Sequence, residues 1–479
     1  MPGGAKSHSP GRARRAIRRL RPSARLIAGP GSGRLCEAGS SRPARRAQNL
    51  GKTGGAGESW SGSWGGAPNV AENIAVDVLI VGAGLVGGAL AAALAGVGLA
   101  VAVVDRADPG ALTDDAHDGR ASAIALGSQR TLAGIGIWPR IANKAEPILD
   151  IRVTDGDAPG FLHYDHRTVA TGQGAPAPFG WIVENTVTRR AIWARVGALG
   201  SLSVLAPAEL DTLERGPHAV VARLKDGRSV RAALAVSAEG RQSRLRAEAG
   251  IAVTEWSYDQ VGIVCTVRHD KPHRGVAHEH FLPSGPFASL PMTGQRSSIV
   301  WTERADLAPA ALNLDDDAFS AELQRRFGHW LGQVRVDGAR WSYKLGLMHA
   351  ARYIDRRLVL VGDSAHLMHP IAGQGLNLGL RDVAALAETL VDAHRLGLDI
   401  GREDVLERYQ RWRRVDNLTL LGVTDGLNRL FSTALPPVAL ARQLGLAAVN
   451  AMPGLKRLFM RHAMGLVGDL PRLVAGQPL

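Results

Sequence analysis

The sequence VDVLIVGAGLVG, residues 76–87, decides the fold of this chain. An apolar run that ends in glycines predicts a buried strand followed by a tight turn, and the Ala- and Leu-rich segment up to about Gly98 predicts a helix. A second apolar run, residues 100–104, ends at Asp105. This order of strand, turn, helix and strand is typical of a Rossmann-like nucleotide-binding unit.

The three glycines of this turn have separate roles in such a unit. Gly82 permits the tight turn, Gly84 lets the backbone approach a pyrophosphate, and Gly87 allows the helix to pack closely. Asp105 lies about 20 residues after the glycine turn. In such a unit an acid at this spacing binds the ribose hydroxyls of an adenosine. The pattern predicts a dinucleotide site. Purely structural glycines are the alternative, and the pattern does not distinguish NAD from FAD.

A second glycine-rich stretch, LVLVGDSAHLMHPIAGQGLNLGLRD, occupies residues 358–382. Its apolar start predicts a strand that ends at Gly362 and Asp363, where a carboxylate can hydrogen-bond a ribose-like hydroxyl. Gly373 and Gly375 let backbone N–H groups approach a ligand, and a helix beginning near Gly375 points its positive end toward developing negative charge. These features suit a flavin ring and favour FAD.

A third segment, LAVSAEGRQSRLR at residues 234–246, runs from a strand into an acid–glycine turn. With three such motifs in this order, the chain resembles the aromatic-hydroxylating flavin monooxygenases. It is most similar to the ubiquinone-biosynthesis hydroxylases, which act on polyprenylated phenols. The likeness runs from about Val76 to the C-terminus and includes HPIAGQGLNLGLRD (369–382), FLPSGPFASLP (281–291) and DGRASAIAL (118–126).

The resemblance implies an FAD site built from backbone donors at residues 373–377, which face the pyrimidine edge of the flavin, and from Asp363, which fixes the ribityl chain or the pyrophosphate. Arg120 is a phosphate or ring partner by its motif position. Asn185 and Arg189 resemble positions that flank the flavin, although an exposed helix start explains them as well. The full predicted set is Gly82, Gly84, Gly87, Asp105, Arg120, Asn185, Arg189, Gly362, Asp363, Pro370, Gly373, Gln374, Gly375, Leu376 and Asn377.

Two positions depart from the family pattern. Glu239 stands where the family has Asp, so the contact of that carboxylate is expected to shift or to pass through water. Lys344 stands where the family has Pro. Neither change removes a predicted flavin contact.

The resemblance implies that reduced FAD and O2 form a C4a-hydroperoxide that hydroxylates the aromatic ring of a polyprenylated phenol. NAD(P)H or ferredoxin would supply the electrons from outside. No catalytic base is identifiable. No metal site is predicted, since His366 and His369 are interpreted as packing or hydrogen-bonding groups of the flavin loop. The alternatives are another class A flavin-dependent aromatic hydroxylase, or a flavin reductase, acting on a different apolar substrate.

The composition limits where the protein works. None of the apolar runs in the 479 residues is long enough for a membrane-spanning helix. The two cysteines, Cys36 and Cys265, suit a reducing compartment. We expect a cytoplasmic protein, with contact to the periphery of the inner membrane as a further hypothesis, on the matrix side if the chain is eukaryotic. A ubiquinone-biosynthesis complex is a further candidate partner.

The net charge of +13 is concentrated in one segment. Residues 1–72 hold thirteen Lys or Arg and three Glu. We expect this basic extension to be disordered. A mitochondrial transit peptide, an electrostatic tether to anionic lipid or RNA, and an upstream extension from a wrongly assigned start are the competing interpretations. We favour the last, because biased composition alone commonly has no function. We therefore expect no nucleic-acid partner.

The expected fold class is α/β: a Rossmann-like FAD-binding domain with an interleaved β-sheet substrate domain and a C-terminal helical region. An apolar stripe in the last region is expected to pack on the core, and an apolar rim that docks on a membrane is the alternative. Its members are Leu420, Leu421, Val423, Leu427, Leu430 and Phe431. The segment RWRR, residues 411–414, is expected on a polar face of the same region. The expected parts are the extension 1–72, FAD-binding segments 73–180, 181–255 and 346–400, the substrate domain 256–345 and the helical region 401–479.

Overall fold

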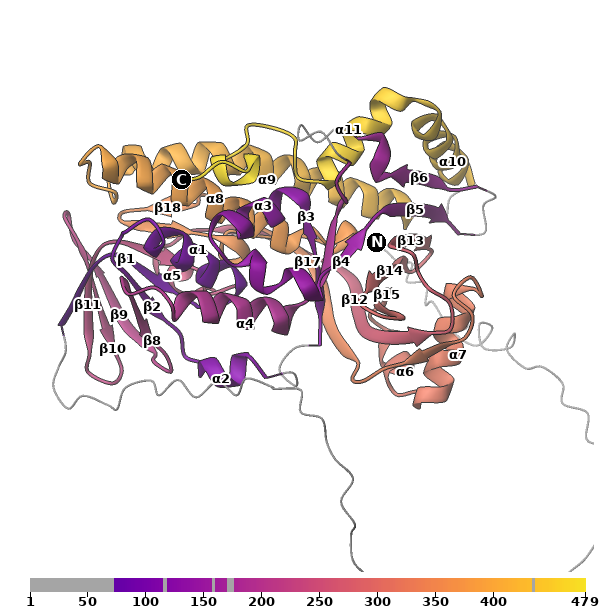
Figure 1. Cartoon of the computed structure of the whole chain (residues 1–479), viewed down its shortest axis with the longest axis horizontal. Coiled ribbons are helices and arrows are strands. Elements are labelled where there is room, and N and C mark those ends of the chain that lie inside the picture. Colours follow the sequence, from indigo (N-terminus) through magenta and orange to yellow (C-terminus); the bar gives the residue numbers. More distant parts are fainter. Residues whose placement is uncertain (1–72, 115–118, 157–159, 170–175, 433–435) are drawn as a thin grey trace, which may run out of the picture. The chain divides into compact units, whose positions relative to one another are not determined.

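The computed structural model describes residues 73–114, 119–156, 160–169, 176–432 and 436–479 (Figure 1). The basic extension 1–72 and Asp118 lie outside the described residues. The predictions made for them therefore stay predictions.

The nucleotide-binding lobe is built on a sheet with a parallel core. Its central strands are mostly apolar, as expected where helices cover both faces of a parallel sheet, and β2 (Val101–Val104) is buried over its whole length. In spatial order the parallel strands are β19 (Leu358–Leu360), β11 (Ser229–Ser237), β1 (Asn73–Val81), β2 (Val101–Val104) and β8 (Leu202–Leu205). Antiparallel strands complete it: β18 (Ile354–Asp355) on β19, and β10 (Val220–Leu224) with β9 (Leu210–Arg215) on β11.

Three helices pack together in this lobe. The alanine-rich α1 (Leu85–Ala95) contacts both α4 (Asn185–Val196) and α8 (Gly375–Arg395). A Cβ on Gly88 of α1 would lie 2.5 Å from Cγ2 of Ile192 in α4. Small residues on α1 therefore allow its neighbours to come close. The short helices α2 (Pro109–Leu112), α3 (Leu126–Gly134) and α5 (Arg244–Glu248) lie in the connections.

Parallel pairing brings three distant turns to one edge of the sheet. Val81 at the end of β1 pairs with Ser237 of β11, and Ser237 pairs with Leu360 of β19. The glycine turn, the Glu239 turn and the Gly362 turn therefore leave the sheet at neighbouring carboxyl ends, which is where open α/β sheets bind ligands.

The second sheet carries the strands expected of a substrate domain. In spatial order they are β20 (His366–Leu367), β17 (Trp341–Ala350), β12 (Val253–His269), β15 (Arg296–Arg304), β14 (Gly285–Met292), β13 (Val276–Leu282), β5 (Asp150–Asp155) and β6 (Leu162–Asp165), with β16 (Val334–Val336) on β12. Helices α6 (Ala308–Leu312) and α7 (Asp316–Phe327) cover one face, where Ile263, Trp301 and Phe319 form a buried cluster. The opposite face, called the inner face below, packs against other parts of the chain.

The inner face meets a third, small sheet and the C-terminal helices. That sheet has the order β3 (Ala121–Ala125), β7 (Gly180–Glu184) and β4 (Glu146–Ile148). Ala277 and Met292 of the inner face form one buried cluster with Ile182 of β7 and Met460 of α11. The helices are α9 (Glu403–Phe431), α10 (Pro436–Ala451), α11 (Pro453–Ala463) and α12 (Arg472–Ala475), and α10 also contacts β6 (Figure 1).

The predicted fold class is confirmed, including the helical C-terminal region. The domain limits stay a prediction. Strands β5 and β6 fall within the range 73–180 but belong to the second sheet, because β5 pairs in parallel with β13.

Two expectations for α9 need correction. The segment 411–414 was expected on a polar face, but Arg413 is buried. In the apolar stripe Leu421 and Phe431 are buried, as expected for core packing, whereas Val423, Leu427 and Leu430 are exposed.

Candidate active site

The glycine turn after β1 is shaped by the protein on one side and open on the other. Gly82 has a φ of +102°, and a Cβ there would lie 2.4 Å from the Ala238 carbonyl oxygen. A Cβ on Gly87 would lie 2.0 Å from the Gly82 carbonyl oxygen. A Cβ on Gly84, in contrast, has no described atom within 4 Å, and no side chain caps the start of α1. Free N–H groups facing open space suit a pyrophosphate.

Asp105 supports this turn from the end of β2. Its carboxylate accepts hydrogen bonds from the backbone N–H of Ala83 at 2.6 Å and of Ala107 at 2.8 Å. A carboxylate has lone pairs left after two such bonds. The predicted contact to ribose hydroxyls is therefore compatible with the role that Asp105 has in the protein.

The two distant glycine motifs touch each other at Val86 of α1. A Cβ on Gly362 would lie 3.2 Å from Cγ2 of Val86, and a Cβ on Gly379 would lie 2.5 Å from the same atom. Only residues without a side chain allow this approach. The structure therefore brings the end of β19 and the start of α8 against the first motif.

Asp363 lies at the Gly362 turn, directly after β19. Its side chain is exposed, yet burial by the surrounding protein raises the pKa of its carboxyl above the usual range, against the opposing effect of His366, Arg120 and Arg241. A group that is surrounded by protein and still reaches solvent is in position for a ligand. Arg120 is exposed, and its guanidinium lies 5.6 Å from the Tyr343 ring.

Asn377 fixes the predicted flavin loop to β3. Its Oδ1 accepts a hydrogen bond from the Ala125 N–H at 2.9 Å, and its Nδ2 donates to the Ala123 carbonyl at 2.8 Å. A Cβ on Gly373 would lie 3.1 Å from Cβ of Ala123. The side chain of Asn377 is thus engaged inside the protein, and the contact of its backbone N–H with a flavin stays a prediction.

The start of α8 is open in the same way as the start of α1. A Cβ on Gly375 has no described atom within 4 Å, and no side chain caps the helix. Pro370, Gln374 and Leu376 are half-buried around it. The loop therefore combines a rigid attachment to β3 with a free helix N-terminus, as a flavin pyrimidine ring requires.

Asn185 and Arg189 lie inside the protein at the start of α4. Both are buried, so the alternative that they belong to an exposed helix start is wrong. Asn185 accepts a hydrogen bond from the Ser122 hydroxyl of β3 at 2.6 Å. Their contact with a flavin stays a prediction.

The contacts of Glu239 account for a glutamate at this position, where the family has Asp. Its carboxylate accepts hydrogen bonds from the hydroxyls of Ser237 and Ser243 and from the N–H of Leu245 at 3.0 Å. The longer side chain thus binds the start of α5 within the protein.

A buried charge network lies beneath the Gly362 turn. Asp382 accepts hydrogen bonds from the Gly362 N–H at 3.0 Å, from His366 Nε2 at 2.6 Å and from Arg413 Nε at 2.8 Å. Burial alone would raise the pKa of Asp382, but His366 and Arg413 outweigh it and lower that pKa to about 2. Local sequence patterns did not indicate this ion pair, because Arg413 lies on another helix.

The two loop histidines have different surroundings. His366 is bound to Asp382, whereas both ring nitrogens of the buried His369 have no hydrogen-bond partner among the described residues. Burial lowers the pKa of His369 to about 4, so the ring is neutral at pH 7. Its ring packs edge-on against Tyr258 at 5.2 Å. Among the described residues no cluster of three or more His, Cys, Asp or Glu could hold a metal ion.

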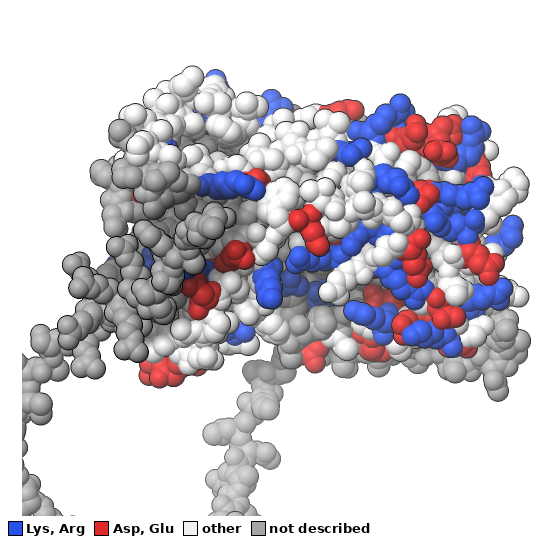
Figure 2. Space-filling view, turned by 180° about the vertical axis from the view of Figure 1, so that it is seen from behind, with Lys and Arg blue, Asp and Glu red and all other residues white. Residues whose placement is uncertain are grey.

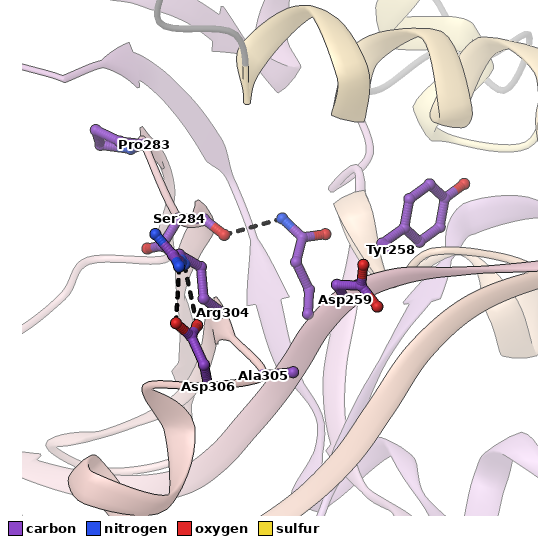
Figure 3. Close-up of a pocket in the computed structure, with 8 residues that line it drawn as sticks. Tyr258, Asp259, Pro283, Ser284, Arg304, Ala305 and Asp306 are labelled. Carbon is purple, nitrogen blue, oxygen red and sulfur yellow. Dashed lines mark hydrogen bonds and ion pairs between the residues drawn. The ribbon is translucent and has the colours of Figure 1, made fainter. Parts of the chain in front are cut away.

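A pocket of about 440 Å³ opens at the end of the second sheet (Figure 3). Six of its eight lining residues are polar or charged. The Gln260 amide donates to the Ser284 carbonyl at 2.9 Å, and Arg304 is paired with Asp306. Tyr258, which contacts His369, forms one side. The predicted FAD residues are not part of its lining, so this pocket is not where we place the flavin.

Fold and loops together define an FAD-dependent monooxygenase. The family model described as "FAD binding domain" matches residues 75–416. The ubiquinone hydroxylase UbiL of Rhodospirillum rubrum is 56% identical over 406 residues, covering 84% of this chain and 93% of that protein. The 3-demethoxyubiquinol 3-hydroxylase of Escherichia coli is 34% identical, covering 81% of this chain and 98% of that protein.

Among solved structures, p-nitrophenol 4-monooxygenase PnpA from Pseudomonas putida has the same fold, with a TM-score of 0.69 at 20% identity over 83% of this chain and 99% of that chain. The chain therefore belongs to the ubiquinone hydroxylase family of FAD-dependent monooxygenases.

Substitution of Gly84 tests the pyrophosphate position. We expect Gly84→Val to weaken FAD binding roughly tenfold or more, because the added side chain enters the open space that the ligand needs. The apoprotein should keep its thermal unfolding midpoint. Gly200→Val is the matched control, since a Cβ there also has no described neighbour within 4 Å. Equal FAD affinity of the two variants in a fluorescence titration would contradict the assignment.

Neutralising Asp382 tests the buried network. Asp382→Asn removes the fully buried one of the two carboxylate partners of Arg413 and leaves Asp416, which should cost about 1.5–3 kcal/mol in the free energy of unfolding. A depressed pKa also means that the wild-type pair stabilises the fold above about pH 4 and loses this effect as the pH falls toward 2. Urea unfolding at several pH values measures both effects. Asp404→Asn, in an exposed ion pair with Arg402, is the control and should change little.

Proposed function

We propose that this protein hydroxylates the aromatic ring of a polyprenylated phenol in ubiquinone biosynthesis. The observation that carries the proposal is the 56% identity to a ubiquinone hydroxylase over 84% of the chain. The inner face of the second sheet supports an apolar substrate, because Ala277, Ala288, Leu290 and Met292 supply much of its surface.

When bound, FAD supplies the two-electron activation of O2 that ring hydroxylation needs. The chain's own residues position it: the α1 start binds phosphate, Asp363 and Asp105 bind hydroxyls, and the N–H groups of residues 373–377 meet the pyrimidine edge. Buried apolar residues around the loop, such as Met368 and Ile371, keep water away from the reacting atoms.

The electron donor is not assigned by any motif. The sequence contains one glycine fingerprint of the dinucleotide type, and FAD occupies it in this proposal. Reduced nicotinamide at a surface groove and reduced ferredoxin from a reductase are the two candidates. Adding NADPH alone to the FAD-loaded protein and recording the flavin absorbance distinguishes them. NADPH alone bleaches the flavin only if nicotinamide is the direct donor.

We propose further that α10 and α11 contact a lipid surface. Leu444, Met452, Leu458 and Phe459 are exposed there, and residues 436–463 contain four Lys or Arg and no Asp or Glu. Seen from behind, the surface over these helices is largely uncharged, whereas charged residues of both signs alternate over the rest (Figure 2). Apolar groups flanked by basic ones suit an anionic membrane that holds a lipid-tailed phenol. No described helix is long and apolar enough to cross a membrane.

The origin of the oxygen atom added to the ring tests the reaction. The FAD-loaded protein, given a geranyl-substituted phenol, a reductant and isotopically labelled O2, should form a product with one labelled oxygen on the ring. A flavin reductase would consume reductant and form H2O2 without labelling the phenol. Mass spectrometry of the product separates the two, and an unlabelled phenol would overturn the proposed function.

Vesicle sedimentation tests the lipid contact. Leu458→Glu with Phe459→Glu should reduce binding to phosphatidylglycerol vesicles roughly tenfold by placing charges at the bilayer. Leu398→Glu, at an exposed leucine before α9, is the control. Measurement in about 1 M salt, where electrostatic attraction by residues 1–72 is screened, isolates the apolar contribution. Unchanged binding of the double variant in high salt would refute the contact.

A further inference from the structure

Strand β13 presents its side chains to two different environments, because residues alternate between the faces of a sheet. His278 packs on Trp330 with ring centroids 4.2 Å apart, and His280 is hydrogen-bonded to Thr154 at 2.6 Å. Phe281, on the other face, stacks on Phe431 of α9 at 3.8 Å. Glu279 therefore lies on the same face as Phe281, which is the inner face.

The neighbours of Glu279 on this face are apolar. Its partners on the adjacent strands are Ala288 of β14 and Val153 of β5. Ala277, two positions earlier on the same strand, belongs to the buried cluster with Met460 of α11. A carboxylate in the middle of an apolar sheet face is costly to bury without a partner. No described residue forms a hydrogen bond or ion pair with Glu279.

The middle of the inner face is not fully packed. Glu279, Val153 and Val300 are half-buried, although α9, α10 and α11 contact this face at Phe431, Arg442 and Met460. Burial nevertheless raises the pKa of Glu279 to about 7. As with Asp363, the carboxylate of Glu279 is surrounded by protein and still partly accessible, so a ligand can reach it.

The inner face is connected to the flavin loop through β3. Ala123 of β3 packs against the inner-face cluster, and the same side chain is the nearest neighbour of Gly373 in the loop. A phenol seated on the inner face therefore has the predicted flavin ring on one side and Glu279 on the sheet side. This placement rests on the proposed function.

The other charged groups near this face do not account for the pKa of Glu279. Asp155 of β5 is paired with Arg442 of α10 at 2.7 Å, and Asp425 with Arg429 of α9. The remaining charged or titratable groups on the helix α11 are Lys456, Arg457, Arg461 and His462. Burial is the sole cause of the raised pKa.

We propose that Glu279 is a catalytic residue that accepts the proton of the substrate's phenolic hydroxyl during ring hydroxylation. As the ring carbon bonds to one oxygen of O2, the phenolic O–H bond breaks, its electron pair enters the ring and the proton moves to the carboxylate. The second oxygen atom leaves as water, with electrons from the reduced nicotinamide or ferredoxin. The ring carbon, which now bears the new hydroxyl, then loses its hydrogen as a proton, and the electron pair of that C–H bond restores the aromatic ring. The phenolic oxygen takes back the proton that Glu279 held, so the carboxylate is regenerated.

The pH dependence of the reaction tests this role. Glu279 must be ionised to act, so kcat/KM of the wild type should rise as the pH increases through about 7. E279Q has nearly the same volume but accepts no proton. It should lose this rise and fall by about 10²–10³ in kcat/KM above neutral pH. E214Q, at an exposed glutamate of β9, is the control for removal of one carboxylate and should keep the wild-type profile.

A binding measurement gives a readout that does not depend on turnover. A geranyl-substituted phenol and its methyl ether are titrated into the oxidised FAD-loaded protein, and the change in flavin absorbance reports binding. Above pH 7 the wild type should prefer the phenol roughly tenfold, because an ionised carboxylate accepts the phenolic hydrogen bond. Below pH 7 the preference should shrink. E279L should show no preference at any pH, and normal FAD content shows that it is folded.

A wild-type preference that is independent of pH, or an E279Q profile equal to that of the wild type, would overturn the role of Glu279. These outcomes differ from failure of the proposed function, in which the wild type itself neither binds nor hydroxylates the phenol.

Discussion

The parallel pairing of β11 with both β1 and β19 is the constraint on which the rest of the structure depends. These strands come from three distant parts of the chain, and their common direction places all three following turns at one edge of the sheet. Gly362 and Gly379 then pack on Val86 of α1, and the starts of α1 and α8 at Gly84 and Gly375 stay open. A dinucleotide that spans a pyrophosphate and a flavin needs two such helix starts, and neither motif alone supplies them.

Buried polar groups hold these turns in place. Asp382 connects the Gly362 turn to α9 through Arg413, and Asn377 connects the flavin loop to β3. Since an unpaired charge in such a network is far more costly than an exposed one, the network favours one geometry of the loop. The second sheet can then present its inner face to a ring whose position is already defined, with α9 to α11 covering the remaining side.

Local patterns were enough to predict the glycine turns, the parallel sheet and the C-terminal helices, because steric requirements of glycine and apolar periodicity are properties of short segments. Contacts between distant segments were not predictable. The local pattern predicts Arg413 on the surface. In the structure it is buried and paired with Asp382, which lies 31 positions away. Strand β5 joined the second sheet through a partner more than a hundred residues downstream. The alternation His278–Glu279–His280 did not reveal which side faces the flavin loop, since that depends on the stacking of Phe281 on α9.

The most direct test of this account is an experimental structure of the protein with FAD bound. The account predicts the pyrophosphate at the start of α1 beside Gly84, and the isoalloxazine ring within hydrogen-bonding distance of the backbone N–H groups of residues 373–377. A flavin bound elsewhere, or a purified chain that takes up no FAD, would contradict it.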